Sequence, residues 1–172
     1  MTRQAFTIRP AVASDVAIIA RHRRAMFQAI GLKGSENLDA MEVKFRAWVV
    51  EKIKCGEYLG WLATDEQGFV VAGAGMWIIP WPPHPADMSE RRAYIMNVYT
   101  ESPYRLRGLA RRLTSTLLDW CREHGISTVT LHASKEGRAL YEALGFRQTN
   151  EMRIQLTPDE FETEQVVVYE QR

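Results

Sequence analysis

Four arginines surround a single glycine in residues 105–112, which carry the sequence RLRGLARR. The pattern is typical of a helix start, where the backbone carries a partial positive charge and acidic residues are normally favoured. No acidic residue occurs between Glu101 and Asp119. Exposed N–H groups at a helix start bind anions, arginine side chains suit phosphate, and Gly108 would let an anion approach the backbone closely. The segment is therefore a candidate phosphate-binding loop.

Two other interpretations of this cluster stay open, a solvated basic helix end and a docking patch for nucleic acid. The chain has 22 Lys and Arg against 21 Asp and Glu, for a net charge of +1. Proteins that bind nucleic acid or a membrane surface usually carry a larger basic excess, so both classes of partner are disfavoured. The known phosphate motifs are absent, because the sequence has no G-x-x-x-x-G-K-[ST] and no G-x-G-x-x-G after its first expected strand.

The elements that position the loop follow from hydrophobic periodicity. Residues 91–100 predict a strand, and the arginine cluster then opens a helix that ends at Gly125. A buried stripe on this helix is expected from the spacing of Leu109, Leu113, Leu117 and Trp120. A strand over residues 126–133, a short helix over 135–145 and a strand over 146–156 follow. The strands before and after the long helix should be joined as a right-handed parallel crossover.

The rest of the chain predicts a further set of strands and helices. Strands are expected over residues 5–11, 58–65 and 69–80, and helices over 14–31, with Ser14 as a plausible N-cap, and over 37–56. The last two of these strands should form a hairpin, and the glycines of GAG at residues 73–75 favour close backbone packing or a bulge. Residues 80–90 form a rigid proline-rich loop, and the tail over 161–172 could add a last strand. No linker or repeat divides the chain, so we expect one α/β domain over residues 1–172.

Composition agrees with a single globular domain. The chain has 172 residues and 46% hydrophobic content, enough for a core without disulfide staples. Its cysteines, Cys55 and Cys121, are far apart and form no C-x-x-C pair, so neither a disulfide framework nor a metal site is expected. The first residues contain no apolar signal core, and no run of about 18 apolar residues occurs. We therefore expect a reduced, cytoplasmic protein without a membrane span.

Two motifs in residues 93–146 resemble the acetyl-CoA-binding half of the GNAT superfamily of N-acetyltransferases. The family signature Q/R-x-x-G-x-G/A corresponds to Arg105 through Ala110, between a strand and a helix, and the pattern L-Y-x-x-L-G-F corresponds to Leu140 through Phe146. The two motifs occur in the family's order and separation. The resemblance implies a GNAT-like α/β fold, with a mixed, mostly antiparallel sheet of about seven strands, helices on both faces and splayed fourth and fifth strands.

The resemblance also implies acetyl-CoA as the cofactor. In the family, the pyrophosphate of coenzyme A sits on backbone N–H groups of the arginine loop, and the pantetheine arm pairs with the end of the preceding strand. Many members bind the arm with an asparagine, in place of which this chain offers Ser134 or, with a one-residue ambiguity, Lys135. The cofactor-binding residues implied are Val98, Tyr99, Thr100, Arg105, Leu106, Arg107, Gly108, Leu109, Ala110, Arg111, Ser134 and Tyr141.

Tyr141 matches the family tyrosine that protonates the departing thiolate or holds its sulfur. A phenol suits this task because it donates one proton and is neutral at pH 7, although in isolation an ordinary core aromatic would be the better interpretation. The general base is not obvious, since the strand over 91–100 lacks the acid that some members use. Asn97 could hold a water that relays the amine proton, and no base is needed if the amine arrives neutral.

The acceptor side of the site is less well defined by the sequence. In the family, the first two helices and the loop before the fourth strand shape this pocket, which suggests Met26, Phe27, Trp77, Trp81 and His132 as lining residues. Core packing is an equal alternative for Phe27 and Trp77, and a structural role is favoured for His132. Arg24, or its neighbour Arg23, could bind an acceptor carboxylate, with a solvated helix face as the alternative.

These patterns together predict an N-acetyltransferase that transfers an acetyl group from acetyl-CoA to a primary amine of a small molecule. The amine would attack the thioester directly in a ternary complex, without a covalent acyl-enzyme. Transfer to a protein or peptide amine stays open, as does a non-catalytic acyl-CoA-binding sensor or interaction module. The β-rich tail could pair across a homodimer.

Overall fold

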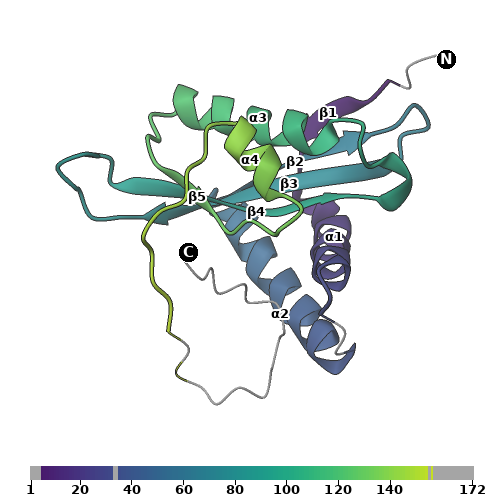
Figure 1. Ribbon diagram of the computed structural model, residues 1–172. Helices are drawn as coiled ribbons and strands as arrows, with labels where there is room; N and C mark the ends of the chain where they lie inside the picture. Colours follow the sequence, from purple (N-terminus) through teal and green to yellow (C-terminus); the bar gives the residue numbers. More distant parts are fainter. Residues whose placement is uncertain (1–4, 33–34, 155, 157–172) are drawn as a thin grey trace.

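A single five-stranded sheet lies at the centre of the computed structural model, which describes residues 5–32, 35–154 and 156 (Figure 1). Its strands run in the order β1 (Thr7–Pro10), β2 (Tyr58–Thr64), β3 (Val70–Pro80), β4 (Arg91–Thr100) and β5 (Val129–Leu131). The first four strands are antiparallel neighbours, and β5 is parallel to β4. The expectation of a mixed, mostly antiparallel sheet is confirmed.

Helices cover both faces of this sheet, as expected (Figure 1). One face carries α1 (Val16–Ala29) and α2 (Ser35–Lys54), and the opposite face carries α3 (Leu109–Glu123) and the short α4 (Arg138–Ala143). No helix among the described residues is long and apolar enough to cross a membrane.

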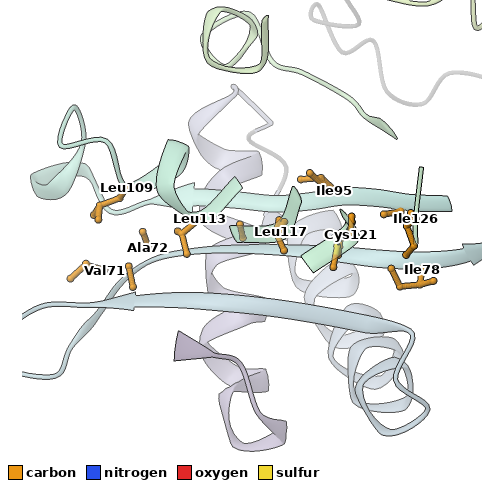
Figure 2. Packing of buried hydrophobic residues seen from close by; sticks show 13 residues of the cluster. Val71, Ala72, Ile78, Ile95, Leu109, Leu113, Leu117, Cys121 and Ile126 are labelled. Atoms are coloured by element: carbon orange, nitrogen blue, oxygen red, sulfur yellow. Dashed lines mark hydrogen bonds between the residues drawn. The ribbon is translucent and has the colours of Figure 1, made fainter. Parts of the chain in front are cut away.

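The core between α3 and the sheet follows the stripe expected from the sequence (Figure 2). Leu109, Leu113 and Leu117 are almost completely buried, one turn apart along the helix. They pack against strand residues that alternate toward this face, among them Ile78 and Ile95. Each fully buried leucine contributes roughly 1.5–3 kcal/mol to stability, so this stripe fixes α3 and the loop before it against the sheet.

A second, smaller core lies between the sheet and the pair α1 and α2. Its buried members are Ile19 and Ala20 of α1, Phe45 and Val49 of α2, and Tyr58 of β2. The two helices and the sheet thereby enclose aromatic rings on the face opposite α3.

The start of α1 differs from the expectation. Ser14 does not cap the helix, because a 3₁₀ turn over Ala13–Asp15 (η1) precedes Val16. The Asp15 carboxylate accepts the Val12 N–H at 2.8 Å and pairs with Arg9 at 2.7 Å. The hydrogen bond from Arg9 lowers the pKa of Asp15. The Asp15 carboxylate therefore accepts a backbone N–H before the helix, in place of the serine hydroxyl that was expected to cap it.

The expected total of about seven strands is wrong for the described part of the chain, which forms five. Residues 147–154 form no strand, and Met152 and Ile154 are 94% and 79% exposed. The physical reason lies in the sequence, since five consecutive polar residues over 147–151 offer no apolar face to pack on the sheet. The tail over 161–172 lies outside the described residues.

Hydrogen bonds hold the proline-rich loop after β3 in place, as expected for a rigid loop. A bridge joins His84 to Asp87, and the Asp87 carboxylate accepts hydrogen bonds from the hydroxyls of Ser127, at 2.5 Å, and of Thr128. These bonds hold the pKa of Asp87 down to about 2. The carboxylate therefore connects the β3–β4 loop to the segment that leads into β5.

Candidate active site

β4 and β5 separate halfway along β4. Their ladder pairs Ala93 with Val129 and ends where Ile95 meets Leu131, whereas β4 continues to Thr100. Among the described residues, the rest of β4 has no strand partner on that side. Its N–H and C=O groups are therefore available to an extended ligand that can pair like a strand.

A bulge in β4 begins at the same point. Asn97 has a φ of +57°, and the register with β3 slips between Gly73, opposite Tyr99, and Gly75, opposite Met96. Asparagine tolerates this left-handed conformation better than most residues. Its side chain is 4% exposed, accepts a hydrogen bond from Arg23 Nη1 at 2.7 Å and donates one to Tyr58 Oη at 3.2 Å. These two bonds fix the bulge to α1 and β2.

The glycines opposite the bulge make room for side chains of the α1 and β2 region, Gly75 for Tyr58 and Gly73 for His22 and Leu62. A Cβ on Gly75 would lie 2.0 Å from Tyr58 Oη, and a Cβ on Gly73 would lie 3.2 Å from His22 Nδ1. The close packing that the sequence favoured for this glycine segment is confirmed. Burial raises the pKa of Tyr58 to about 12, so the hydroxyl beside Asn97 is neutral at physiological pH.

The loop between β4 and α3 exposes the backbone at the helix start. A short 3₁₀ turn (η2, Ser102–Tyr104) leads into it, and Leu106 and Gly108 both adopt positive φ, +60° and +78°. The first helical bond joins the Arg112 N–H to the Gly108 carbonyl, so the preceding N–H groups of α3 have no intrahelical acceptor. A Cβ on Gly108 would meet no atom within 4 Å, so space is open beside these groups.

The arginines of this loop bind backbone carbonyls. Arg105 Nε donates to Thr100 O at 3.1 Å, Arg107 Nη2 to Pro103 O at 3.1 Å, and Arg112 Nη2 to Phe6 O at 3.2 Å. Within the described part of the chain, no carboxylate lies within ion-pair distance of Arg105 or Arg112. The loop therefore combines open N–H groups with positive charge, the two features by which a helix start binds phosphate.

Tyr141 lies on α4, above the sheet on the α3 side (Figure 1). Its ring packs edge-on against Phe146, at 5.8 Å between centroids, and closely approaches Gly137. Burial raises the pKa of Tyr141 to about 12, and its hydroxyl has no hydrogen-bond partner among the described residues. The hydroxyl therefore keeps its proton at neutral pH and is free to donate it. Ser134, at the start of this segment, accepts the Gly137 N–H at 3.1 Å and shapes the turn.

The face of β4 toward α2 carries an aromatic network. Trp48 of α2 stacks on Phe45 and meets Tyr58 and Trp77 edge-on, with centroids 5.4–6.2 Å apart. Trp77 pairs across the sheet with Tyr94, whose hydroxyl lies 2.5 Å from His132 Nδ1. This network extends from α2 to the end of β5.

Comparisons of the sequence and the fold with known proteins identify relatives of this chain. A model of the acetyltransferase (GNAT) family matches residues 20–146. The chain belongs to this family.

Solved GNAT structures resemble the whole described fold. A GCN5-related N-acetyltransferase from Ralstonia eutropha is 35% identical, with a TM-score of 0.83 over 88% of this chain and 99% of that chain. A predicted acetyltransferase from Clostridium acetobutylicum, in a structure with acetyl-CoA, is 25% identical, with a TM-score of 0.81 over 88% and 96%. Human N-acetyltransferase 8 is 29% identical over 94 residues, 53% of this chain and 39% of that protein, so the chain spans well under half of this relative's length.

On this GNAT framework, the expected acceptor residues divide into two groups. Phe27 lies with its ring 4.9 Å from the Arg23 guanidinium, next to the half-buried Met26, and Trp77 and His132 belong to the network around Tyr94. Trp81 lies instead at the far end of β4, where its half-exposed ring is covered by Arg92 at 4.2 Å.

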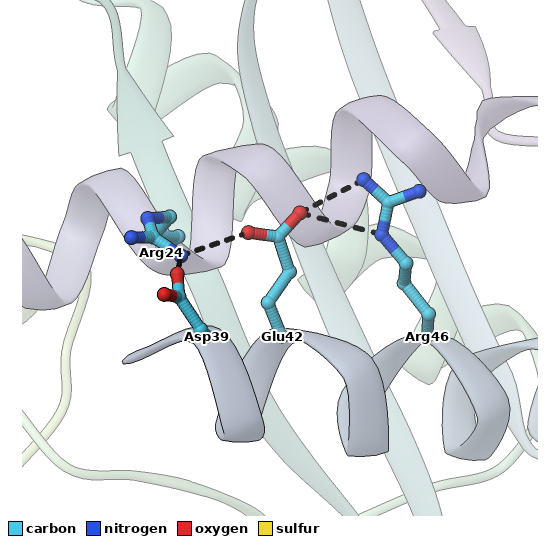
Figure 3. Close-up of polar contacts among 4 residues, drawn as sticks. All are labelled: Arg24, Asp39, Glu42 and Arg46. Carbon is cyan, nitrogen blue, oxygen red and sulfur yellow. Dashed lines mark hydrogen bonds and ion pairs between the residues drawn. The ribbon is translucent and has the colours of Figure 1, made fainter. Parts of the chain in front are cut away.

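Arg24 points toward carboxylates of α2 (Figure 3). Its guanidinium binds Asp39 and Glu42 of α2, and Glu42 in turn binds Arg46 at 2.8 Å. The sequence did not decide which of the two arginines faces the expected acceptor pocket. In the structure, Arg23 lies beside Asn97. The helical spacing indicates this orientation, because Arg23 lies on the same helix face as Ile19 and Phe27, whereas Arg24 does not.

His22 is a further polar residue in this region that the sequence did not indicate. It is 1% exposed, and neither ring nitrogen has a hydrogen-bond partner among the described residues. It lines a cavity of about 10 Å³ together with Tyr58 and Asn97. Nε2 lies 3.4 Å from a Glu101 oxygen that Arg21 binds at 2.8 Å. Burial, followed by the charge of Arg21, lowers the pKa of His22 to about 4.

Proposed function

We propose that this protein transfers the acetyl group of acetyl-CoA to the primary amine of a small molecule, by direct attack in a ternary complex. The observation that carries the proposal is the junction between β4 and α3. There, a strand edge without a partner leads into an open, positively charged helix start. An extended arm that ends in a pyrophosphate matches these two features in the same order.

The residues of this junction fit coenzyme A by their chemistry. The backbone from Arg105 to Arg111 would hold the pyrophosphate, with Gly108 and Ala110 small enough for close approach. Val98, Tyr99 and Thr100 would pair with the pantetheine arm along the edge that β5 leaves, and Ser134 would contact it from the other side. The free space at Gly108 supports this placement.

The catalytic step would use groups that the chain already positions. Bound acetyl-CoA supplies an activated thioester, and the amine forms a C–N bond as the C–S bond breaks. The Val98 N–H stabilises the negative charge that develops on the carbonyl oxygen. Tyr141 donates its phenolic proton to the departing sulfur. Asn97, held by Arg23 and Tyr58, orients a water that relays the amine proton to solvent. Positioning of the two reactants supplies much of the rate.

A coupled assay of CoA thiol release over a panel of amine classes tests this function. The panel should include amino acids, polyamines, aminoglycosides and peptides with free N-termini, and acetyl-CoA binding should be measured in parallel by calorimetry. We expect binding, and release above the hydrolysis background with at least one small amine. Binding without release by any amine would favour a non-catalytic acyl-CoA sensor, and release with peptides alone would favour a protein acceptor.

A further inference from the structure

The Arg23 guanidinium is a partly buried cation without an acidic partner among the described residues. It lies between the rings of Phe27 and Phe45, with its central carbon 4.9 and 4.6 Å from their centroids. Nη1 donates to Asn97 Oδ1 at 2.7 Å, and Nε is buried without any hydrogen-bond partner. Burial lowers the pKa of this side chain. Buried cations are normally paired with an anion, so this position favours an anionic ligand.

Other arginines of the same region are paired with carboxylates, whereas the described polar groups around Arg23 are neutral. Arg9 binds Asp15, Arg21 binds Glu101, and Arg24 binds two carboxylates. The polar groups that face Arg23 are the amide of Asn97 and the hydroxyls of Tyr58 and Tyr94, all of them neutral at pH 7. Among the described residues, acids therefore pair with the neighbouring arginines, whereas the partners of Arg23 are neutral.

A second cation lies on the other side of Tyr94. Arg153 Nη2 lies 3.1 Å from His132 Nε2, and the Nδ1 of the same ring lies 2.5 Å from Tyr94 Oη. Burial raises the pKa of Tyr94, which the charges of Arg153 and Arg23 lower and the charge of Glu151 raises. Two cations and one carboxylate therefore act on this tyrosine, and the excess of positive charge favours an anionic ligand.

The position of Arg23 restricts which anion it can hold. Its guanidinium contacts Asn97 directly, and Asn97 is the bulge residue at which the proposed reaction takes place. An anion on Arg23 must then lie close to the reacting amine. The carboxylate of a free α-amino acid satisfies this condition, because one carbon separates it from the amine. A peptide N-terminus does not, because its α-carbon carries a neutral amide.

We infer that the acceptor is a free α-amino acid whose carboxylate binds the guanidinium of Arg23, an inference that rests on the proposed acetyltransferase function. The rings of Phe27 and Phe45 exclude water from one side of this contact and strengthen it. The neutral side chains around Arg23 would provide specificity, since an acceptor without the anion leaves the guanidinium unpaired.

The test compares each of the common L-amino acids with its own amide, which keeps the amine and side chain and removes the negative charge. Binding is measured by calorimetry in the presence of coenzyme A, and turnover by thiol release with acetyl-CoA. We expect at least one amino acid to bind and react, with its amide weaker by roughly ten- to a hundredfold, the range for a lost charge-assisted hydrogen bond.

Variants connect this preference to the side chain. Arg23→Gln should reduce the ratio of amino-acid to amide affinity to near one, while Arg23→Lys should retain part of it because the charge stays and the planar fork is lost. Arg46→Gln, which removes an equal charge from the neighbouring helix, should leave the ratio unchanged. Circular dichroism and thermal melting verify that each variant is folded, and acetyl-CoA affinity verifies the donor site.

Three results would overturn the inference. These are equal binding of amino acids and amides, an unchanged ratio in Arg23→Gln, and no binding of any amino acid to the wild-type protein with coenzyme A. Failure of the proposed function has a different signature, in which amino acids bind and lose affinity in Arg23→Gln but no thiol is released. The binding measurements therefore test the carboxylate site at Arg23, and the turnover measurements test whether the protein transfers the acetyl group.

Discussion

The guanidinium of Arg23 and the side-chain amide of Asn97 are joined by a hydrogen bond of 2.7 Å, which ties α1 to the bulge of β4. The other end of the amide donates to Tyr58 Oη from β2. One buried side chain thus connects two strands and a helix at the point where β5 leaves β4. The conformation of this strand edge depends on that connection.

Replacement of Asn97 by alanine should therefore reduce stability. The change leaves Arg23 Nη1 and Tyr58 Oη without a partner in a buried position, at a cost of roughly 1–3 kcal/mol. Alanine must also adopt the φ of +57°, which adds to the loss. Urea denaturation measures the difference. Asn150→Ala, at an exposed position, is the matched control and should stay within about 0.5 kcal/mol of wild type. Equal midpoints for Asn97→Ala and wild type would contradict the structural role.

A negative charge in the β4–α3 loop should weaken the binding of coenzyme A. Gly108→Asp places a carboxylate in the space beside the open N–H groups, so affinity for coenzyme A should fall at least tenfold. Gly125→Asp is its matched control, because both glycines flank α3 with positive φ, +78° and +68°, and both face open space. The two variants should lose similar stability, and Gly125→Asp should keep wild-type affinity in calorimetry. Equal losses of affinity would show that the anion does not bind at Gly108.

The β4–α3 loop, where we propose that coenzyme A binds, was predictable because its signals are local. The apolar spacing from Leu109 to Leu117 fixes the buried face of α3, and the glycine at residue 108 marks the backbone turn before it. One of the two motifs that resemble the family lies in this loop and the start of α3, and the other lies in α4 and the residues after it. The sequence could therefore place the loop, the helix and Tyr141 in advance.

The surroundings of Asn97 and Arg23, where we propose that the acceptor binds, were less predictable because they depend on register across the sheet. The conformation of Asn97 follows from a slip against Gly73 and Gly75, which no pattern within β4 reveals. The neutral partners of Arg23 come from β2 and β4, far away in the sequence. The expected strand over residues 146–156 was wrong for a different reason, because the five polar residues over 147–151 give it no apolar face to pack on the sheet.

His22 should make stability depend on pH in the acidic range. In the unfolded chain it protonates near its ordinary pKa of 6.5, whereas in the folded protein burial holds the pKa at about 4. Between these values the unfolded state binds more protons, so stability falls as pH decreases from 6.5 to 4, by up to about 3 kcal/mol. Below pH 4 both states are protonated and this contribution no longer changes.

Urea denaturation at several pH values measures this loss, and His22→Leu should reduce it. His84→Gln, in the exposed loop after β3, should retain the loss because His22 is intact. A His22→Leu variant whose stability falls between pH 6.5 and pH 4 as steeply as that of the wild type would assign the titration to other groups.

Tyr141→Phe should separate binding from turnover. The hydroxyl has no hydrogen-bond partner among the described residues, and burial keeps it protonated, so its removal should cost little stability and leave the affinity for coenzyme A unchanged. Loss of the proton donor should slow turnover by roughly a hundredfold or more. Tyr104→Phe is an informative comparison, because its hydroxyl donates to Asp65 at 2.9 Å and its loss should reduce stability instead. If Tyr141→Phe turned over at the wild-type rate, Tyr141 would be a packing residue of α4, and the departing sulfur would take its proton from another group or from solvent.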